Sequence, residues 1–237
     1  MPDEPNLSDT WPPAPAGVTG WLSELCGDGL TGFMPPGLPD AVWVLNAMYE
    51  HDGRADATST ATGRGLGRAE HPGPGWRRLR WAELARRTGD AVVPDGTLPG
   101  VRCFPSVKRD GRWPLDVVPP TEGSADRETW HRLVDLLIEH SPAGPDTPCL
   151  AYYSPLALGG VDFENPHVRA GRLGAAKTLY DKAETDFSPS NLWPQDRSWC
   201  LCTDYDLWAT KVAGPRSLIG ALLDDPELEA VRLPWAS

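Results

Sequence analysis

The fold of this 237-residue chain is decided by residues 188–214, SPSNLWPQDRSWCLCTDYDLWATKVAG. The first four residues are typical of a turn, because proline presets φ while Ser and Asn side chains bond nearby backbone groups. From Ser198 to Trp208 the residues alternate, and this alternation predicts a strand. One face of the strand would carry Trp199, Leu201, Thr203, Tyr205 and Leu207, and the other Cys200, Cys202, Asp204, Asp206 and Trp208.

The polar end of this predicted strand supplies the candidate binding residues. Asp204 and Asp206 would share a face, about 7 Å apart, where two carboxylates can act as an acid/base pair or hold a metal. The structural alternative, a solvated strand edge, is the favoured reading for this pair. Trp193 and Trp208 are expected at the surface as contacts for a partner. Arg197 would bond one of the two carboxylates and fix the loop, or bind the carboxylate of a ligand.

Length and composition indicate one folded domain. A chain of 237 residues can bury a sizeable core, and 40% hydrophobic with 23% charged residues is a globular composition. The 26 prolines and 24 glycines predict many loops and short elements. Abundant Ala, Gly, Pro and Arg also fit a GC-rich bacterial coding sequence.

The net charge of −11 is unevenly distributed along the chain. Residues 1–53 contain eight Asp and Glu and no Lys or Arg, whereas residues 54–112 contain twelve Lys and Arg against six Asp and Glu. An acidic protein is a poor partner for nucleic acid, since binding phosphates requires a concentrated basic surface. An acidic surface does suit a protein partner with basic groups. The arginines at 54–112 leave nucleic acid as the minor alternative.

The cysteine and histidine positions favour neither a metal nor a cofactor. The five cysteines are scattered, and residues 200–202 form Cys-x-Cys rather than the Cys-x-x-Cys of zinc sites. Asp162, Glu164 and His167 could form a ligand or acid/base set, but nothing in the sequence brings them together. The acidic N-terminus does not resemble a signal peptide, and no apolar run approaches the length of a membrane span. We therefore expect a cytoplasmic protein with reduced thiols, no cofactor and no membrane contact.

The remaining elements are predicted from periodicity and turn residues. A continuous apolar run predicts a central strand at 41–49, and a Gly-, Ala- and Thr-rich segment predicts a long loop at about 51–75. Residues 1–20 are interpreted as a flexible tail that becomes ordered only if Trp11 finds a groove, and residues 21–237 as a single domain. We further expect strands at 101–108, 113–118, 149–154 and 228–233, a hairpin turn at 109–112, and helices at 20–26, 81–87, 125–140, 172–182 and 216–223.

Two resemblances accompany this reading. The segment from residue 174 onward, with its SPSNLWPQDRSWC and TDYDLWATKVAG motifs, is similar to a module of uncharacterised actinobacterial proteins. That resemblance covers the last quarter to third of the chain and implies no catalytic residue. In acidity, tryptophan content and α+β pattern the chain also resembles bacterial toxin-immunity proteins, which implies a protein partner.

The sequence therefore predicts an α+β fold, with a mostly antiparallel sheet of five or six strands and helices on one face. The first functional hypothesis is a protein-binding, immunity-like or regulatory protein that uses an acidic surface with Trp193 and Trp208. The alternative is an enzyme or small-ligand-binding protein with a polar site at Asp204 and Asp206, assisted by Arg197 or a histidine.

Overall fold

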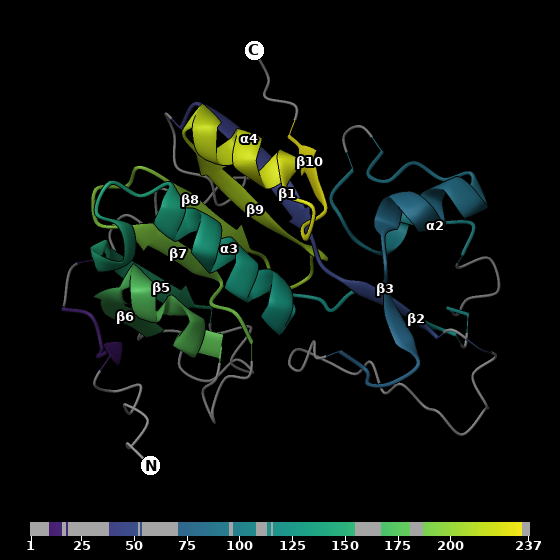
Figure 1. The fold of residues 1–237 in the computed structure, drawn as a ribbon, viewed down its shortest axis with the longest axis horizontal. Coiled ribbons are helices and arrows are strands. Elements are labelled where there is room, and N and C mark those ends of the chain that lie inside the picture. The colour runs from purple at the N-terminus through teal and green to yellow at the C-terminus, as the bar shows by residue number, and fades with distance from the viewer. Residues whose placement is uncertain are drawn as a thin grey trace.

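The computed structural model describes residues 10–15, 18, 38–51, 53, 71–94, 97–107, 113–114, 116–154, 167–180 and 187–233. These residues form an α+β fold with a seven-stranded and a three-stranded sheet (Figure 1). The helix predicted at 20–26, the turn at 109–112 and most of the loop at 51–75 lie outside the described residues, so those predictions stay untested.

The larger sheet is antiparallel throughout, in the order β10-β1-β9-β8-β7-β5-β6. It confirms the mostly antiparallel sheet expected from the sequence, with more strands than the five or six predicted. Its strands are β1 (Asp40–Leu45), β5 (Pro148–Tyr153), β6 (His167–Arg172), β7 (Asn191–Pro194), β8 (Cys200–Thr203), β9 (Ala209–Gly214) and β10 (Ala230–Arg232).

Three helical segments cover one face of this sheet (Figure 1). They are α3 (Arg127–Glu139), α4 (Arg216–Asp224) and the 3-10 segment η5 (Leu173–Tyr180). α3 follows the predicted apolar periodicity, and its buried residues include Trp130, Leu133, Val134 and Leu137. Its N-terminus is capped by Asp126, whose carboxylate accepts the Thr129 amide at 2.9 Å.

The smaller sheet, in the order β3-β2-β4, lies beside the larger one with α2 (Figure 1). It contains β2 (Met48–His51), β3 (Trp76–Leu79) and β4 (Val117–Val118), and α2 spans Trp81–Thr88. Two short 3-10 turns complete the list of elements: η3 (Val101–Cys103) and η4 (Gly144–Asp146). α2 ends, as predicted, at Gly89, which takes a left-handed conformation with φ of 78°. Glu229, which precedes β10, caps its other end by accepting the Trp81 and Ala82 amides at 2.7 Å.

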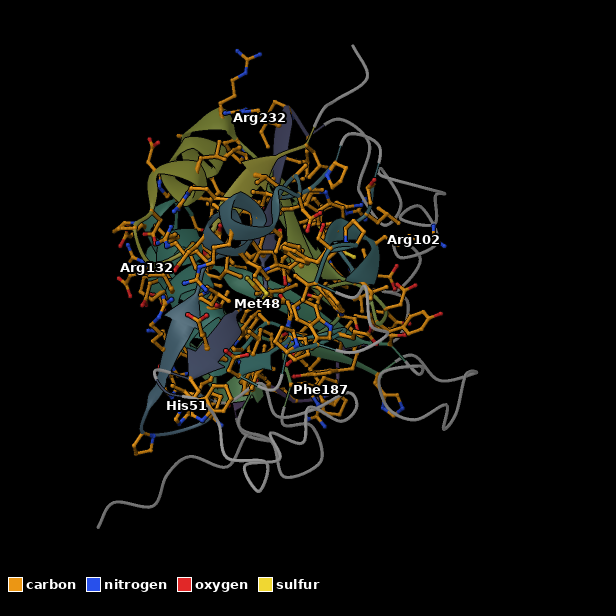
Figure 2. All side chains as sticks on the ribbon, turned by 90° about the vertical axis from the view of Figure 1, so that its right-hand side faces the viewer. Met48, His51, Arg102, Arg132, Phe187 and Arg232 are labelled. Atoms are coloured by element: carbon orange, nitrogen blue, oxygen red, sulfur yellow. The ribbon has the colours of Figure 1, made fainter. Side chains whose placement is uncertain are left out.

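The two sheets are joined at Asn46 and Ala47, where the sequence had predicted one continuous strand. The apolar run at 41–49 is therefore two strands, β1 and β2, in different sheets. The break is stabilised by hydrogen bonds that pattern reasoning does not detect: Asn46 Nδ2 donates to the Thr121 carbonyl at 2.7 Å, and the indole of Trp81 donates to the Asn46 carbonyl at 2.9 Å. Figure 2 shows Met48, at the start of β2, inside the packed interior and His51, at its end, near the rim.

Two further predictions of local structure were wrong. Residues 101–107 do not form a strand; Val101–Cys103 is the 3-10 turn η3, and its last residue, Cys103, is fully buried in the core cluster that joins the two sheets. Within the helix expected at 172–182, Leu173–Tyr180 is of 3-10 type, and Arg172 belongs to β6. The helix at 216–223 and the strands at 149–154 and 228–233 are found, each within two residues of its expected ends.

An ion pair joins α3 to the turn that follows α4. Asp225 accepts hydrogen bonds from Arg132 Nε and Nη2 at 2.9 and 2.6 Å, and from the amides of Glu227 and Leu228 at 2.9 and 3.0 Å. Burial by itself raises the pKa of the Asp225 carboxyl, but these hydrogen bonds outweigh it and hold the pKa below its usual range. The ionised form is therefore more favourable in the folded chain than in the unfolded one.

Asp225→Asn is expected to lower the free energy of unfolding by about 1–3 kcal/mol near neutral pH. Because the folded-state pKa is depressed, the contribution of Asp225 is present above its unfolded pKa and is lost as pH falls through the folded pKa. Urea unfolding of both proteins from about pH 7 to about pH 3 should therefore show the difference narrowing. The exposed neighbour serves as control, since Asp224→Asn should change stability by less than about 0.5 kcal/mol. A difference that stays constant with pH would contradict this account.

Candidate functional site

The segment singled out in the sequence forms a hairpin rather than one strand. β8 ends at Thr203, the chain reverses through residues 204–208, and β9 returns beside it with Thr203 opposite Thr210. The two threonine hydroxyls are hydrogen-bonded at 2.8 Å in the buried end of the hairpin. The loop is closed by Leu207, whose amide donates to the Asp204 carbonyl at 3.2 Å. Both carboxylates therefore lie in a hairpin loop, and the alternation expected to reach Trp208 stops at Thr203.

A row of residues crosses the larger sheet on the face opposite the helices. Neighbouring strands place Trp43 opposite Lys211 and Lys211 opposite Cys202, and the pairing continues to Asn191. Directly opposed residues share a face of the sheet. The alternate residues of these strands, such as Val42, Leu192, Leu201 and Val212, pack in the core cluster with α3 and α4. We call Trp43, Lys211, Cys202 and Asn191 the polar row.

Lys211 is the central residue of the polar row and is 3% exposed. Its ammonium nitrogen lies 4.8 Å from the centroid of the Trp43 ring, a cation–π distance. Burial lowers the pKa of Lys211, and the neighbouring Cys202 and Asp204 partly oppose this shift. A buried lysine with a lowered pKa carries a larger fraction of neutral amine, which is the nucleophilic form.

The two thiols beside Lys211 are poor nucleophiles. Burial raises the pKa of Cys202 to about 12, although Lys211 acts in the opposite direction. Burial also raises the pKa of Cys200 well above the ordinary thiol value. Since the thiolate is the reactive form, both side chains stay protonated and serve as weakly polar packing groups. The nucleophilic group of the polar row is therefore the Lys211 amine rather than a cysteine thiol.

Asp204 connects the polar row to the surface. Its side chain is half-buried, and its carboxylate accepts the Tyr205 amide at 2.7 Å. Burial raises the pKa of Asp204, the charge of Asp206 adds to the shift, and the Tyr205 amide and Lys211 oppose it. Each of the two groups shifts the pKa of the other, so the ionisation of the amine and that of the carboxyl are coupled. Asp206 is exposed and acts on the site only through its charge.

The expected exposure of the two tryptophans was wrong. Trp193 is 1% exposed and packs with Leu150, Val168 and Cys200 on the sheet face that carries the polar row. Trp208 is 4% exposed, and its indole donates to the Glu122 carboxylate at 3.1 Å. Because the chain reverses after Thr203, Trp208 lies in a core cluster that joins the two sheets and includes Trp43, instead of continuing an exposed strand face. Neither ring is available for a partner in this structure.

Arg197 is not brought to the carboxylates. It lies exposed in the turn between β7 and β8, with a φ of 58°, and its amide donates to the Pro194 carbonyl at 2.9 Å. Asp204 and Asp206 follow the other end of β8, which is four residues long. The structure thus separates Arg197 from the pair that it was expected to bond. Of the predicted binding residues, Asp204 is the acidic one whose charge acts on Lys211.

Sequence reasoning missed Lys211, Asn191 and Trp43 as members of a site. The available signal was a lysine within the apolar run of residues 209–214, since lysine is rarely buried without a specific environment. Asn191 was interpreted as a turn residue, but it is the first residue of β7, and its side-chain Nδ2 donates to the Leu201 carbonyl at 3.4 Å. The pairing of β1 with β9, which brings Trp43 to Lys211, joins segments too distant in sequence for local patterns to predict.

Metal binding finds no support among the residues that the structure describes, where no three His, Cys, Asp or Glu side chains are grouped as ligands. Asp162 and Glu164 lie outside the described residues, and His167 is exposed at the start of β6. Within the described ranges, no helix combines the length and the apolar character that crossing a bilayer requires.

Comparisons with known proteins assign no family to this chain. No protein-family model matches it, and neither the curated proteins nor the solved structures contain a match. The function is therefore inferred from the geometry of the polar row and its surroundings. The resemblances to an actinobacterial module and to immunity proteins stay predictions.

Proposed function

We propose that the chain binds a small, uncharged carbonyl compound through the amine of Lys211, with Asp204 as the neighbouring acid. The observation that carries the proposal is a lysine that is 3% exposed, lies on a sheet face against an aromatic ring, and is electrostatically coupled to a half-buried carboxyl. This is the enzyme or small-ligand alternative of the sequence analysis, with Lys211 as the reacting group.

The chemistry of an imine matches this set of side chains. The neutral amine of Lys211 attacks the carbonyl carbon, the nitrogen loses a proton, the carbonyl oxygen leaves as water, and a carbon–nitrogen double bond forms. Asp204 supplies the proton that the departing hydroxyl needs and recovers one from the nitrogen. The Trp43 ring packs beside the amine.

The charge of the surroundings selects an uncharged ligand. Asp204 and Asp206 precede and follow the exposed Tyr205 in the hairpin loop, and the chain as a whole has a net charge of −11. A carboxylate or phosphate that approached along this loop would be repelled by the charge of Asp206 and by the acidic chain around it. An aldehyde or ketone without charge avoids that repulsion, and its apolar part can pack against the Trp43 ring.

The test is reductive trapping with propionaldehyde near neutral pH, followed by peptide mass spectrometry. Borohydride converts an imine into a stable alkylated lysine, and we expect modification first at Lys211. The matched control is Lys177, whose ammonium is paired with Asp135 at 2.6 Å. Modification should disappear from residue 211 in Lys211→Met, persist there in Lys177→Met, and slow in Asp204→Asn. Pyruvate, which carries a carboxylate, should trap more slowly than propionaldehyde. Labelling of Lys177 ahead of Lys211 would refute the proposal.

One observation keeps a protein partner as a second candidate function. With Trp193 and Trp208 buried, the described residues with large exposed hydrophobic side chains are Leu98 and Tyr205, at 37% and 43% exposure. Tyr205 stands between Asp204 and Asp206, and an aromatic ring flanked by acids suits a basic protein surface. Affinity capture with the wild type and with Tyr205→Ala tests this candidate. A specific protein retained by the first and lost by the second supports it, while recovery that ignores Tyr205 opposes it.

A further inference from the structure

The N-terminal segment extends the larger sheet at its β6 edge. The Ala170 amide donates to the Pro12 carbonyl at 3.0 Å, and the Ala14 amide donates to the Val168 carbonyl at 2.9 Å. Pro13 and Arg169 form an antiparallel bridge between these two bonds. An open sheet edge is thereby completed by residues from more than 150 positions earlier in the chain. Strand addition of this kind is a common mode of peptide recognition.

The ring of Trp11 anchors this segment in a fitted slot. Trp11 is fully buried, and its indole donates to the Ala175 carbonyl at 3.1 Å. Its own carbonyl accepts Arg169 Nη1 at 3.0 Å. A Cβ added at Gly171 would lie 2.5 Å from Trp11 Cδ2 and 2.7 Å from the Thr10 carbonyl oxygen. Glycine is therefore required at 171 to leave room for the ring and the backbone beside it. We call this space the Trp11 slot.

These contacts have the form of a peptide–groove complex. Main-chain bonds to β6 hold an extended backbone whatever its sequence, and the slot adds selectivity for one large ring. Pro12 and Pro13 favour an extended backbone and carry no amide hydrogen, so the outer edge of the segment offers fewer donors. Such a ligand loses little conformational freedom when it binds.

We propose that the Trp11 slot is a peptide-binding site, that Thr10–Ala14 is its tethered ligand, and that the same segment of a second copy can replace it. The length of the chain permits the exchange. Residues 15–39 separate the segment from β1, and an extended chain of that length spans up to roughly 80 Å. In one copy the tether raises the effective concentration of the segment, so exchange between copies is expected at high protein concentration.

The first test uses the full chain with its own ligand weakened. A fluorescent peptide of residues 8–15, SDTWPPAP, is titrated into Trp11→Ala and followed by polarisation. We expect it to bind roughly a hundredfold tighter than the same peptide with alanine in place of tryptophan. The double variant Trp11→Ala, Gly171→Ala should lose this preference, because the added methyl group occupies the slot. Equal binding of the two peptides, or a preference that survives Gly171→Ala, would overturn the proposal.

A conservative variant keeps the test decisive if Trp11→Ala does not fold. Trp11→Phe retains a ring in the slot but loses the hydrogen bond to Ala175, so the tethered segment binds more weakly and the peptide can compete with it. The tryptophan peptide should displace the tethered segment of Trp11→Phe at a lower concentration than it needs to displace the wild-type segment. Displacement at the same concentration in both proteins would contradict the assignment of the slot.

The exchange between copies is tested by mixing two full-length variants. Trp11→Ala has a vacant slot, and Gly171→Ala has a free segment that its own slot cannot accept. Sedimentation of the mixture should show a species heavier than either variant gives alone. A mixture that sediments like its components, at concentrations where the peptide saturates Trp11→Ala, would overturn the exchange.

Discussion

Trp11→Ala is expected to lower the free energy of unfolding by about 3 kcal/mol, the lower end of the usual cost of deleting a buried tryptophan. The ring is fully buried in the same core cluster as Leu173 and Ala176, and its indole bonds the Ala175 carbonyl. The lower end applies because the detached segment regains chain entropy that partly offsets the lost contacts. Urea unfolding followed by circular dichroism measures the change.

The control for Trp11 is a second tryptophan with a smaller buried area. Trp76 is half-buried at the start of β3, where its ring lies 5.1 Å from that of His51. Trp76→Ala should cost less than half as much as Trp11→Ala, because less apolar surface is exposed to water. A cost of Trp11→Ala no larger than that of Trp76→Ala would contradict the full burial of the Trp11 ring, and a negligible cost would show that residues 10–14 add nothing to the larger sheet.

Lys211→Met is expected to raise the free energy of unfolding by about 1–2 kcal/mol while abolishing reductive trapping at residue 211. Methionine fills nearly the same volume without a charge, so the cost of burying the ammonium disappears. The stabilised variant would lack the amine on which the proposed function depends. This combination of higher stability and lost activity is typical of residues kept for function.

The pH dependence of this difference follows from the lowered pKa of Lys211. Below the folded-state pKa the amine is protonated in both states, and the wild type bears the full cost of the buried charge. As pH rises from the folded-state pKa to the unfolded-state pKa, that cost is lost and the two proteins converge. Thermal unfolding over this range measures the convergence. A Lys211→Met protein that is less stable than the wild type throughout would mean that the ammonium supports the fold.

Local patterns predicted the helices well where one face is apolar. α3 and α2 follow helical periodicity, and the end of α2 at Gly89 follows from the need for a left-handed residue. Within the predicted tail at 1–20, which stays untested as a whole, the described residues 10–15 are ordered with Trp11 buried. The groove itself could not be predicted, since it is formed by β6 and η5 more than 150 residues away.

The candidate site was predicted less well because its geometry depends on turns and strand order. One continuous alternation would place Trp208 on an exposed strand face with Asp204, but the reversal after Thr203 buries it in the cluster that joins the two sheets. Both faces of β8 are buried, so alternation in that strand does not separate core from surface. Asp204 was identified because carboxylates in a short segment are visible in any sequence. Lys211 was missed because its role depends on Trp43, which lies on the neighbouring strand of the sheet but far away in the sequence.

The central claim is that the polar row holds an amine whose ionisation is controlled by burial and by Asp204. The most direct measurement is an NMR titration of the Lys211 amine in the wild type and in Asp204→Asn. The account predicts a pKa below that of an ordinary lysine, and a further decrease in the variant, because the charge of Asp204 opposes the effect of burial. An ordinary lysine titration that does not respond to Asp204→Asn would contradict it.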